Sequence, residues 1–89
     1  MGAVPLPKDS ASNLSIGQVL AKLSIEFPEL SSSKIRFLED QGLVLPERSA
    51  GGYRTYTLPL VERIRVVLSL QRDHFLPLRV IREILADMD

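Results

Sequence analysis

The 89-residue chain contains no cysteine, no tryptophan and a single histidine, His74. The lack of cysteine excludes disulfides and thiolate metal sites, and one histidine leaves little for zinc binding or a histidine-based catalytic triad. No apolar run approaches the roughly 18 residues of a membrane helix, and the N-terminus lacks the hydrophobic region of a signal peptide. We therefore expect a cytoplasmic protein that is not an enzyme and uses no metal or cofactor.

The chain also lacks an excess of charge of either sign, since it has 11 basic and 11 acidic side chains. At first sight this balance argues against nucleic-acid binding, because phosphate neutralisation dominates such affinity. The charges are unevenly distributed, however. Residues 31–82 carry nine Lys and Arg against five Asp and Glu, whereas residues 83–89 carry three acids and no base. A basic centre with acidic flanks is compatible with DNA binding but leaves the question open.

The hydrophobic content of 45% and the short length indicate one small folded domain. Residues 1–13 hold Pro, Gly, Ser and Ala without an apolar period, so we expect a flexible tail there and a folded domain over 14–89. Ser15 is placed to cap a first helix with one apolar stripe, formed by Ile16, Val19, Leu20 and Leu23. Pro28 interrupts this pattern, because proline cannot continue a helix.

The middle of the chain predicts a helix followed by a hairpin. The helix is expected over residues 31–41, with Ser31 as its N-cap and Gly42 as the left-handed residue after its end. Two short strands are expected at 43–45 and 53–56, separated by a loop that contains Pro, Ser and Gly.

Two further helices complete the pattern. Thr57 is a suitable N-cap for a third helix that ends near Asp73, with a buried face formed by Val61, Ile64, Val67, Leu68 and Gln71. Pro77 opens a fourth helix, whose buried stripe is Leu78, Ile81, Ile84, Leu85 and Met88. The order predicts a mainly α fold with a small two-stranded β wing, which is a winged helix-turn-helix.

Five segments carry a family resemblance in their order and spacing. They are SIGQV at 15–19, IRFLE at 35–39, GLV at 42–44, GYRTY at 52–56, and residues 78–85. Together they resemble the N-terminal winged-helix DNA-binding domain of the MerR family of bacterial transcription regulators, over residues 14–86. The resemblance implies double-stranded DNA as the partner, bound at an inverted-repeat promoter site by a homodimer. It also implies that a longer regulator continues beyond this domain.

The chain departs from the family pattern in two places. Leu38 stands where the family usually has a second aromatic residue, which removes a tyrosyl contact to phosphate. The turn between the first two helices is lengthened by residues 27–30. These features, together with residues 71–74 and the following Leu-Pro-Leu, resemble an actinobacterial subgroup with members linked to the control of cell-division genes.

The candidate DNA-binding residues of the second helix are Ser32, Ser33, Lys34 and Arg36. A helix is narrow enough to enter the major groove, where arginine can bind phosphate or the edge of guanine. Lys34 and the two serines lie near the helix N-terminus, where backbone N–H groups favour phosphate. For Arg36, an ion pair with Asp40 one turn later is the competing interpretation.

The remaining candidates lie in the wing, which we define as residues 45–56. Arg54 follows the glycine turn, and the resemblance implies that it meets the DNA backbone beside the groove. Tyr53 can offer a hydroxyl to phosphate, whereas Tyr56 alternates to the other side of the strand and is expected to pack under the wing. Arg48 is either a second contact or an edge-strand charge that blocks aggregation.

Other residues are given structural roles. We expect Phe27, Phe37 and Phe75 in the core rather than stacked on bases, and His74 packed or solvated at a helix junction. Arg63, Arg65 and Arg72 are ambiguous, because any surface helix carries charges. The leading hypothesis is sequence-specific DNA binding with helix 31–41 in the major groove. The alternative is a protein-protein interaction module without DNA binding, since winged helices also dock protein partners.

Overall fold

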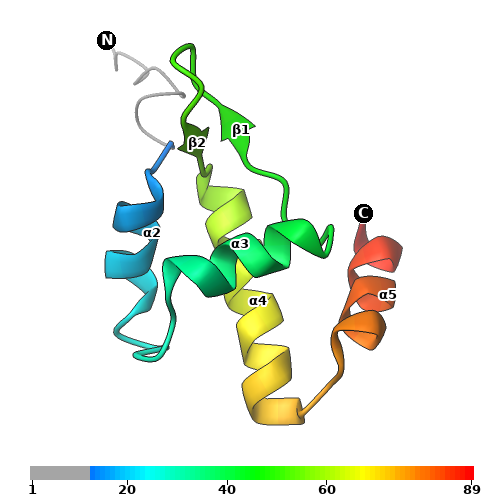
Figure 1. Ribbon diagram of the computed structural model, residues 1–89. Coiled ribbons are helices and arrows are strands. Elements are labelled where there is room, and N and C mark those ends of the chain that lie inside the picture. The colour runs from blue at the N-terminus through cyan, green and yellow to red at the C-terminus, as the bar shows by residue number, and fades with distance from the viewer. Residues whose placement is uncertain (1–12) are drawn as a thin grey trace, which may run out of the picture.

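A computed structural model describes residues 13–89 of the chain. The tail expected over residues 1–13 therefore lies outside the described residues, apart from Asn13. The described chain forms helices and one two-stranded antiparallel sheet, in the order α2 (Ile16–Leu23), α3 (Ser32–Asp40), β1 (Glu47–Arg48), β2 (Arg54–Thr55), α4 (Leu58–His74) and α5 (Leu78–Met88). In Figure 1, α3 crosses in front of α4, with the strands at one end of α4 and the turn to α5 at the other. The predicted winged helix-turn-helix is confirmed.

Helix α2 begins at a capping box. The Ser15 hydroxyl accepts a hydrogen bond from the Gln18 N–H at 3.2 Å, and the Gln18 side chain accepts one from the Ser15 N–H at 2.8 Å. These reciprocal bonds satisfy backbone donors that a helix start leaves free. Val19 and Leu23 then face the core, as the apolar spacing predicted.

Helix α3 has the cap and the end that its sequence predicts. The Lys34 N–H donates to the Ser31 hydroxyl at 3.2 Å, so Ser31 is the N-cap. Gly42 follows the helix with φ of 76°, a conformation that glycine adopts without the steric cost of a Cβ. Ile35 and Leu38 are fully buried, and they hold one side of α3 against the core.

The first expected strand, 43–45, was wrong. Leu43 and Val44 are both buried in the core outside any strand, and the first strand is β1, which pairs Glu47 with Thr55 and Arg48 with Arg54. Two consecutive inward side chains are incompatible with the alternation of a strand that has one buried face. The hairpin therefore begins only after Pro46, which has no N–H to offer a ladder.

Helix α4 is capped by Thr57, whose hydroxyl accepts from the Leu60 N–H at 3.2 Å. Its buried face consists of Val61, Ile64, Val67 and Leu68, while Gln71 is only half-buried. On α5, Ile81 and Leu85 are buried and Ile84 is half-buried, but Met88 is exposed. The predicted stripe of α5 was therefore right except at Met88, because the buried part of the helix ends at Leu85.

The three phenylalanines have different environments. Phe27 is buried as predicted, but Phe37 is 44% exposed and Phe75 is 85% exposed. Phe37 was misplaced because Ile35 and Leu38 occupy the inward side of α3. Phe75 has φ of 55°, a left-handed turn after α4 that directs its ring to solvent and lets Leu76 pack on the core instead. His74 is also exposed at this junction.

Candidate nucleic-acid interface

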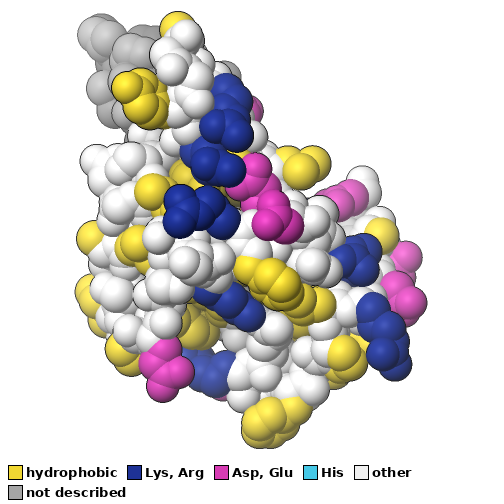
Figure 2. Space-filling model, viewed as in Figure 1, with side chains coloured by type: hydrophobic (Ala, Val, Ile, Leu, Met, Phe, Trp, Pro, Cys, Tyr) yellow, Lys and Arg dark blue, Asp and Glu magenta, His cyan; other side chains and the backbone are white. Residues whose placement is uncertain are grey.

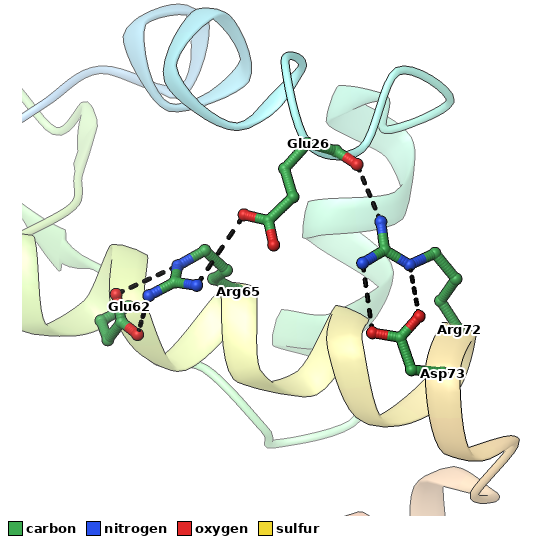
Figure 3. A network of polar contacts seen from close by, with 5 residues as sticks. All are labelled: Glu26, Glu62, Arg65, Arg72 and Asp73. Carbon is green, nitrogen blue, oxygen red and sulfur yellow. Dashed lines mark hydrogen bonds and ion pairs between the residues drawn. The ribbon is translucent and has the colours of Figure 1, made fainter.

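The turn between α2 and α3 is fastened to α4 by two arginines. Arg72 donates to the Glu26 carbonyl at 2.8 Å, and its guanidinium lies 4.4 Å from the centre of the Phe27 ring. Arg65 lies 3.8 Å from the Glu26 carboxylate and also pairs with Glu62. Figure 3 shows these contacts reaching from α4 to the turn. Arg65 and Arg72 thus connect α4 to the segment that leads into α3.

Hydrogen bonds from arginines of α4 lower the pKa of two carboxyl groups, those of Asp73 and Asp89. The hydrogen bond from Arg72 holds the pKa of Asp73 below its ordinary value. Arg63 donates to the Leu43 carbonyl at 2.6 Å and to the Asp89 carboxylate at 2.8 Å, and the latter bond lowers the pKa of Asp89. Arg63 therefore ties α4 to the segment after α3 and to the end of α5.

Two candidate cations of α3, Lys34 and Arg36, have no carboxylate partners. Within residues 13–89, neither Lys34 nor Arg36 forms an ion pair, so the competing pair between Arg36 and Asp40 is not present. The Lys34 ammonium lies 5.5 Å from the centre of the Phe37 ring. Ser33 and Arg36 are exposed, while Ser32 and Lys34 are half-buried. The positive charges of Lys34 and Arg36 are therefore available to an anion.

The tip of the wing is shaped by its own hydrogen bonds. The Ser49 N–H donates to the Tyr53 carbonyl at 2.8 Å, and the Tyr53 N–H donates to the Ser49 hydroxyl at 3.2 Å. Gly52 has φ of 87° in this turn, which explains a glycine there. Arg48 donates to the Gly52 carbonyl at 3.1 Å, so it braces the turn. Tyr53 is 75% exposed and its ring is available at the wing surface.

Arg54 connects the wing to α3. Its Nε donates to the Glu39 carboxylate at 2.8 Å, and this bond raises the pKa of the Arg54 guanidinium. The sequence interpretation assigned Arg54 to a DNA contact and missed this partner, which lies 15 positions earlier. Within the described residues, neither Nη nitrogen of Arg54 donates a hydrogen bond. One edge of the guanidinium is thus occupied, while its Nη donors remain available.

Tyr56 is fully buried, as predicted for the inner side of the wing. Its hydroxyl has no hydrogen-bond partner among the described residues. Burial raises the pKa of the Tyr56 hydroxyl, and the nearby Glu39 charge raises it further. A direct phosphate contact by Tyr56 is incompatible with its burial.

Comparison with known proteins decides the family. The model of the MerR HTH family regulatory protein matches residues 14–88. The chain belongs to this MerR family. Two relatives, one from Mycobacterium bovis and one from Mycobacterium tuberculosis, are each 52% identical over 71 residues, or 80% of this chain and 29% of the relative. Both are named uncharacterized HTH-type transcriptional regulators. No solved structure matches the chain.

The family match confirms the resemblance seen in the sequence and supports DNA-binding regulation for this MerR-family domain. The chain spans less than a third of the length of the curated relatives it matches. Within the described residues, no helix is long and apolar enough to cross a membrane. Nor do these residues contain a group of three or more His, Cys, Asp or Glu side chains that could hold a metal ion.

Two cations on α5 were not among the sequence candidates for this MerR-family domain. Figure 2 shows Lys and Arg side chains on one face, near the wing, over α3 and, beyond a hydrophobic patch, over α5. The basic residues of α5 are Arg79 and Arg82, and Arg82 donates to the Gln41 carbonyl at 2.7 Å. Their spacing of three residues, offset from the buried Ile81 and Leu85, places both on the exposed side of α5.

Proposed function

We propose that this chain binds double-stranded DNA sequence-specifically, as the DNA-binding domain of a bacterial transcription regulator. The observation that carries the proposal is that Lys34 and Arg36 of α3 have no acidic partner within residues 13–89. The family match supports the proposal independently of this geometry. In the proposed complex, the helix over 31–41 enters the major groove, and the wing contacts the DNA backbone beside that groove.

The residues of α3 have two kinds of role in this proposal. Lys34 and Arg36 extend from the helix toward base edges or phosphates, and an arginine that reaches guanine can bind it through two hydrogen bonds. Ser32 and Ser33 lie in the first turn, where their hydroxyls and the free backbone N–H groups suit a phosphate. Bases provide the sequence preference, and phosphates fix the register of the helix.

The wing residues Arg48, Tyr53 and Arg54 contact the flanking backbone. Arg54 has available Nη donors, and Tyr53 has an exposed ring with its hydroxyl. Arg48 already donates to the Gly52 carbonyl, so its phosphate contact would use the guanidinium N–H groups that are not engaged in that bond. Such contacts add affinity for any duplex rather than preference for one sequence.

We also propose that the full regulator is a homodimer that binds an inverted-repeat promoter site in the cytoplasm. The length of the curated relatives leaves ample chain for a dimerisation element. Two-fold symmetry of a dimer matches the symmetry of an inverted repeat. A bacterial transcription regulator acts where the chromosome lies, which is the cytoplasm.

Selection from a pool of random duplex DNA tests the proposed function. The chain, joined to a parallel coiled coil that makes it dimeric, should enrich a sequence with two inverted half-sites. Titration of the enriched duplex at increasing salt should then give a steep loss of affinity, because phosphate contacts release counterions. A chain that is folded yet enriches no sequence and does not bind duplex DNA even at low salt would instead support the protein-interaction alternative.

A further inference from the structure

The hairpin places two like charges opposite each other. Arg48 of β1 and Arg54 of β2 are direct partners in the antiparallel register. Directly opposed residues project to the same face of a two-stranded sheet, and like charges in such a pair repel. Glu47 does not relieve this repulsion, because it is paired with Thr55 on the opposite face. The face that carries both arginines therefore needs an anion from another element.

Glu39 of α3 supplies that anion, and it binds Arg54 through a single nitrogen, Nε. Its carboxylate accepts from Arg54 Nε at 2.8 Å, and the two side chains are only 20% and 32% exposed. Partial burial makes this interaction less screened by solvent than an ion pair on the open surface. The bond uses Nε and leaves both Nη nitrogens without a partner among the described residues. An arginine held by one nitrogen presents its remaining donors in a fixed direction.

We infer that Glu39 is a positioning residue, which orients the Arg54 guanidinium so that its Nη donors meet a DNA phosphate. This inference rests on the proposed function, since it concerns the contact between the wing and the DNA backbone. Orientation before binding reduces the side-chain entropy that is lost when Arg54 contacts a phosphate. The charge of Glu39 has the opposite effect, because a carboxylate near DNA repels the phosphates. Positioning and charge thus predict opposite results when Glu39 is replaced.

The neighbouring Asp40 provides a matched control. It carries the same charge at the next position of α3 and is exposed, and it forms no ion pair within residues 13–89. Asp40→Ala removes a negative charge without removing a contact to Arg54. Glu39→Ala removes both the charge and the hydrogen-bond acceptor. Glu39→Gln removes the charge but retains a side-chain oxygen that can accept from Arg54 Nε.

The 89-residue chain and each variant are titrated into a fluorescein-labelled random-sequence duplex of about 25 base pairs, long enough for two half-sites one helical turn apart. Glu39→Ala should bind about fivefold more weakly than the unmodified chain, the ratio that corresponds to one ordinary hydrogen bond. Asp40→Ala should bind at least as tightly as the unmodified chain, and Glu39→Gln should retain most of the affinity. If Glu39→Ala binds as tightly as Asp40→Ala, the inference is overturned.

Two further measurements separate positioning from a loss of folding. In an Arg54→Lys background, which lacks the guanidinium, Glu39→Ala should cause no additional loss of affinity; an equal loss in both backgrounds would overturn the inference. Without DNA, the NMR signal of the Arg54 Nε–H should be protected from exchange in the unmodified chain and in Glu39→Gln, but not in Glu39→Ala. An unmodified chain that binds no duplex overturns the proposed function itself, whereas normal binding by Glu39→Ala overturns only this inference.

Discussion

Leu14 and Tyr56 exchange two backbone hydrogen bonds, each 2.8 Å long, and form an isolated antiparallel bridge. The bridge joins the segment before α2 to the base of the wing, although the two residues are 42 positions apart in the sequence. It thereby links the start of the helix-turn-helix to the hairpin. Since α3 is joined to the same hairpin through Glu39 and Arg54, the orientation of the wing relative to α3 is set by contacts from both sides.

Replacement of the wing arginine should weaken binding to every duplex. Arg54→Ala removes donors to a backbone phosphate, so affinity should fall alike for selected and unrelated DNA. The slope of log affinity against log salt should decrease by about one, as expected for one lost phosphate contact. Titrations of both duplexes at several salt concentrations measure this slope. An unchanged slope, with circular dichroism showing an intact fold, would remove Arg54 from the interface.

Replacement of the cations on α3 should reduce sequence preference instead. The double variant Lys34→Ala, Arg36→Ala should narrow the difference in binding free energy between selected and random DNA by about 1–3 kcal/mol, if one residue makes a bidentate base contact. Competition binding with the two duplexes measures that difference. Lys22→Ala on α2 is the control for loss of positive charge outside the proposed site. Equal weakening of both duplexes would restrict Lys34 and Arg36 to phosphate contacts.

The buried hydroxyl of Tyr56 should reduce the stability of the fold. Because this hydroxyl has no partner among the described residues, Tyr56→Phe should raise the free energy of unfolding, by about 1 kcal/mol, through removal of an unsatisfied polar group. Urea denaturation measures the change, and DNA affinity should stay the same. Tyr53→Phe is the matched variant at an exposed site, where stability should be unaffected and DNA affinity reduced. Destabilisation by Tyr56→Phe would show that its hydroxyl has a partner in solution.

Stability should decrease in acid through Asp73 and Asp89. Hydrogen bonds from Arg72 and Arg63 lower the pKa of these carboxyls in the folded chain, below the ordinary value of 3.8. A carboxyl with a lowered folded pKa stabilises the fold above its unfolded pKa, and that stabilisation is lost as the pH falls through the folded pKa. Urea denaturation between neutral pH and pH about 3 should show this decrease.

The double variant Asp73→Asn, Asp89→Asn should have a smaller decrease in acid than the unmodified chain. Asp87→Asn is the control, since Asp87 forms no ion pair within the described residues. The effect should be modest, because both carboxylates are partly exposed and screened by solvent. If stability falls with pH identically in the double variant and the control, the ion pairs of Asp73 and Asp89 are excluded as the origin of the acid destabilisation.

The helices could be predicted from the sequence because their signals are local. Ser15, Ser31 and Thr57 cap helices through bonds to residues three positions later, and the apolar spacing within each helix identifies its buried side. The family resemblance rested on the same local segments. Such features depend only on residues within one or two turns, which a single sequence displays directly.

The sequence predictions that were wrong or incomplete involve contacts between distant segments of the chain. Consecutive apolar residues at Leu43 and Val44 resemble a strand, but the core formed by the helices buries both. Nothing near Phe75 in the sequence indicates the left-handed turn that exposes it, since glycine is the usual residue there. The pair between Glu39 and Arg54 connects different elements, so its existence depends on how the wing folds against α3. For the same reason, the sequence did not show that Arg54 has a structural partner.

Dimerisation should increase the affinity of this domain for an inverted repeat. Helices α4 and α5 direct their main apolar stripes into one small core. We therefore expect the 89-residue chain to be mainly monomeric at micromolar concentration and to bind a palindromic duplex weakly. Joined to a coiled coil that makes it dimeric, it should bind about 100-fold more tightly or better, because the second half-site is engaged at high effective concentration. Light scattering, combined with titration of duplexes that hold one or two half-sites, measures both properties. A stable dimer of the 89-residue chain would show that exposed groups such as Met88 on α5 form an interface between copies.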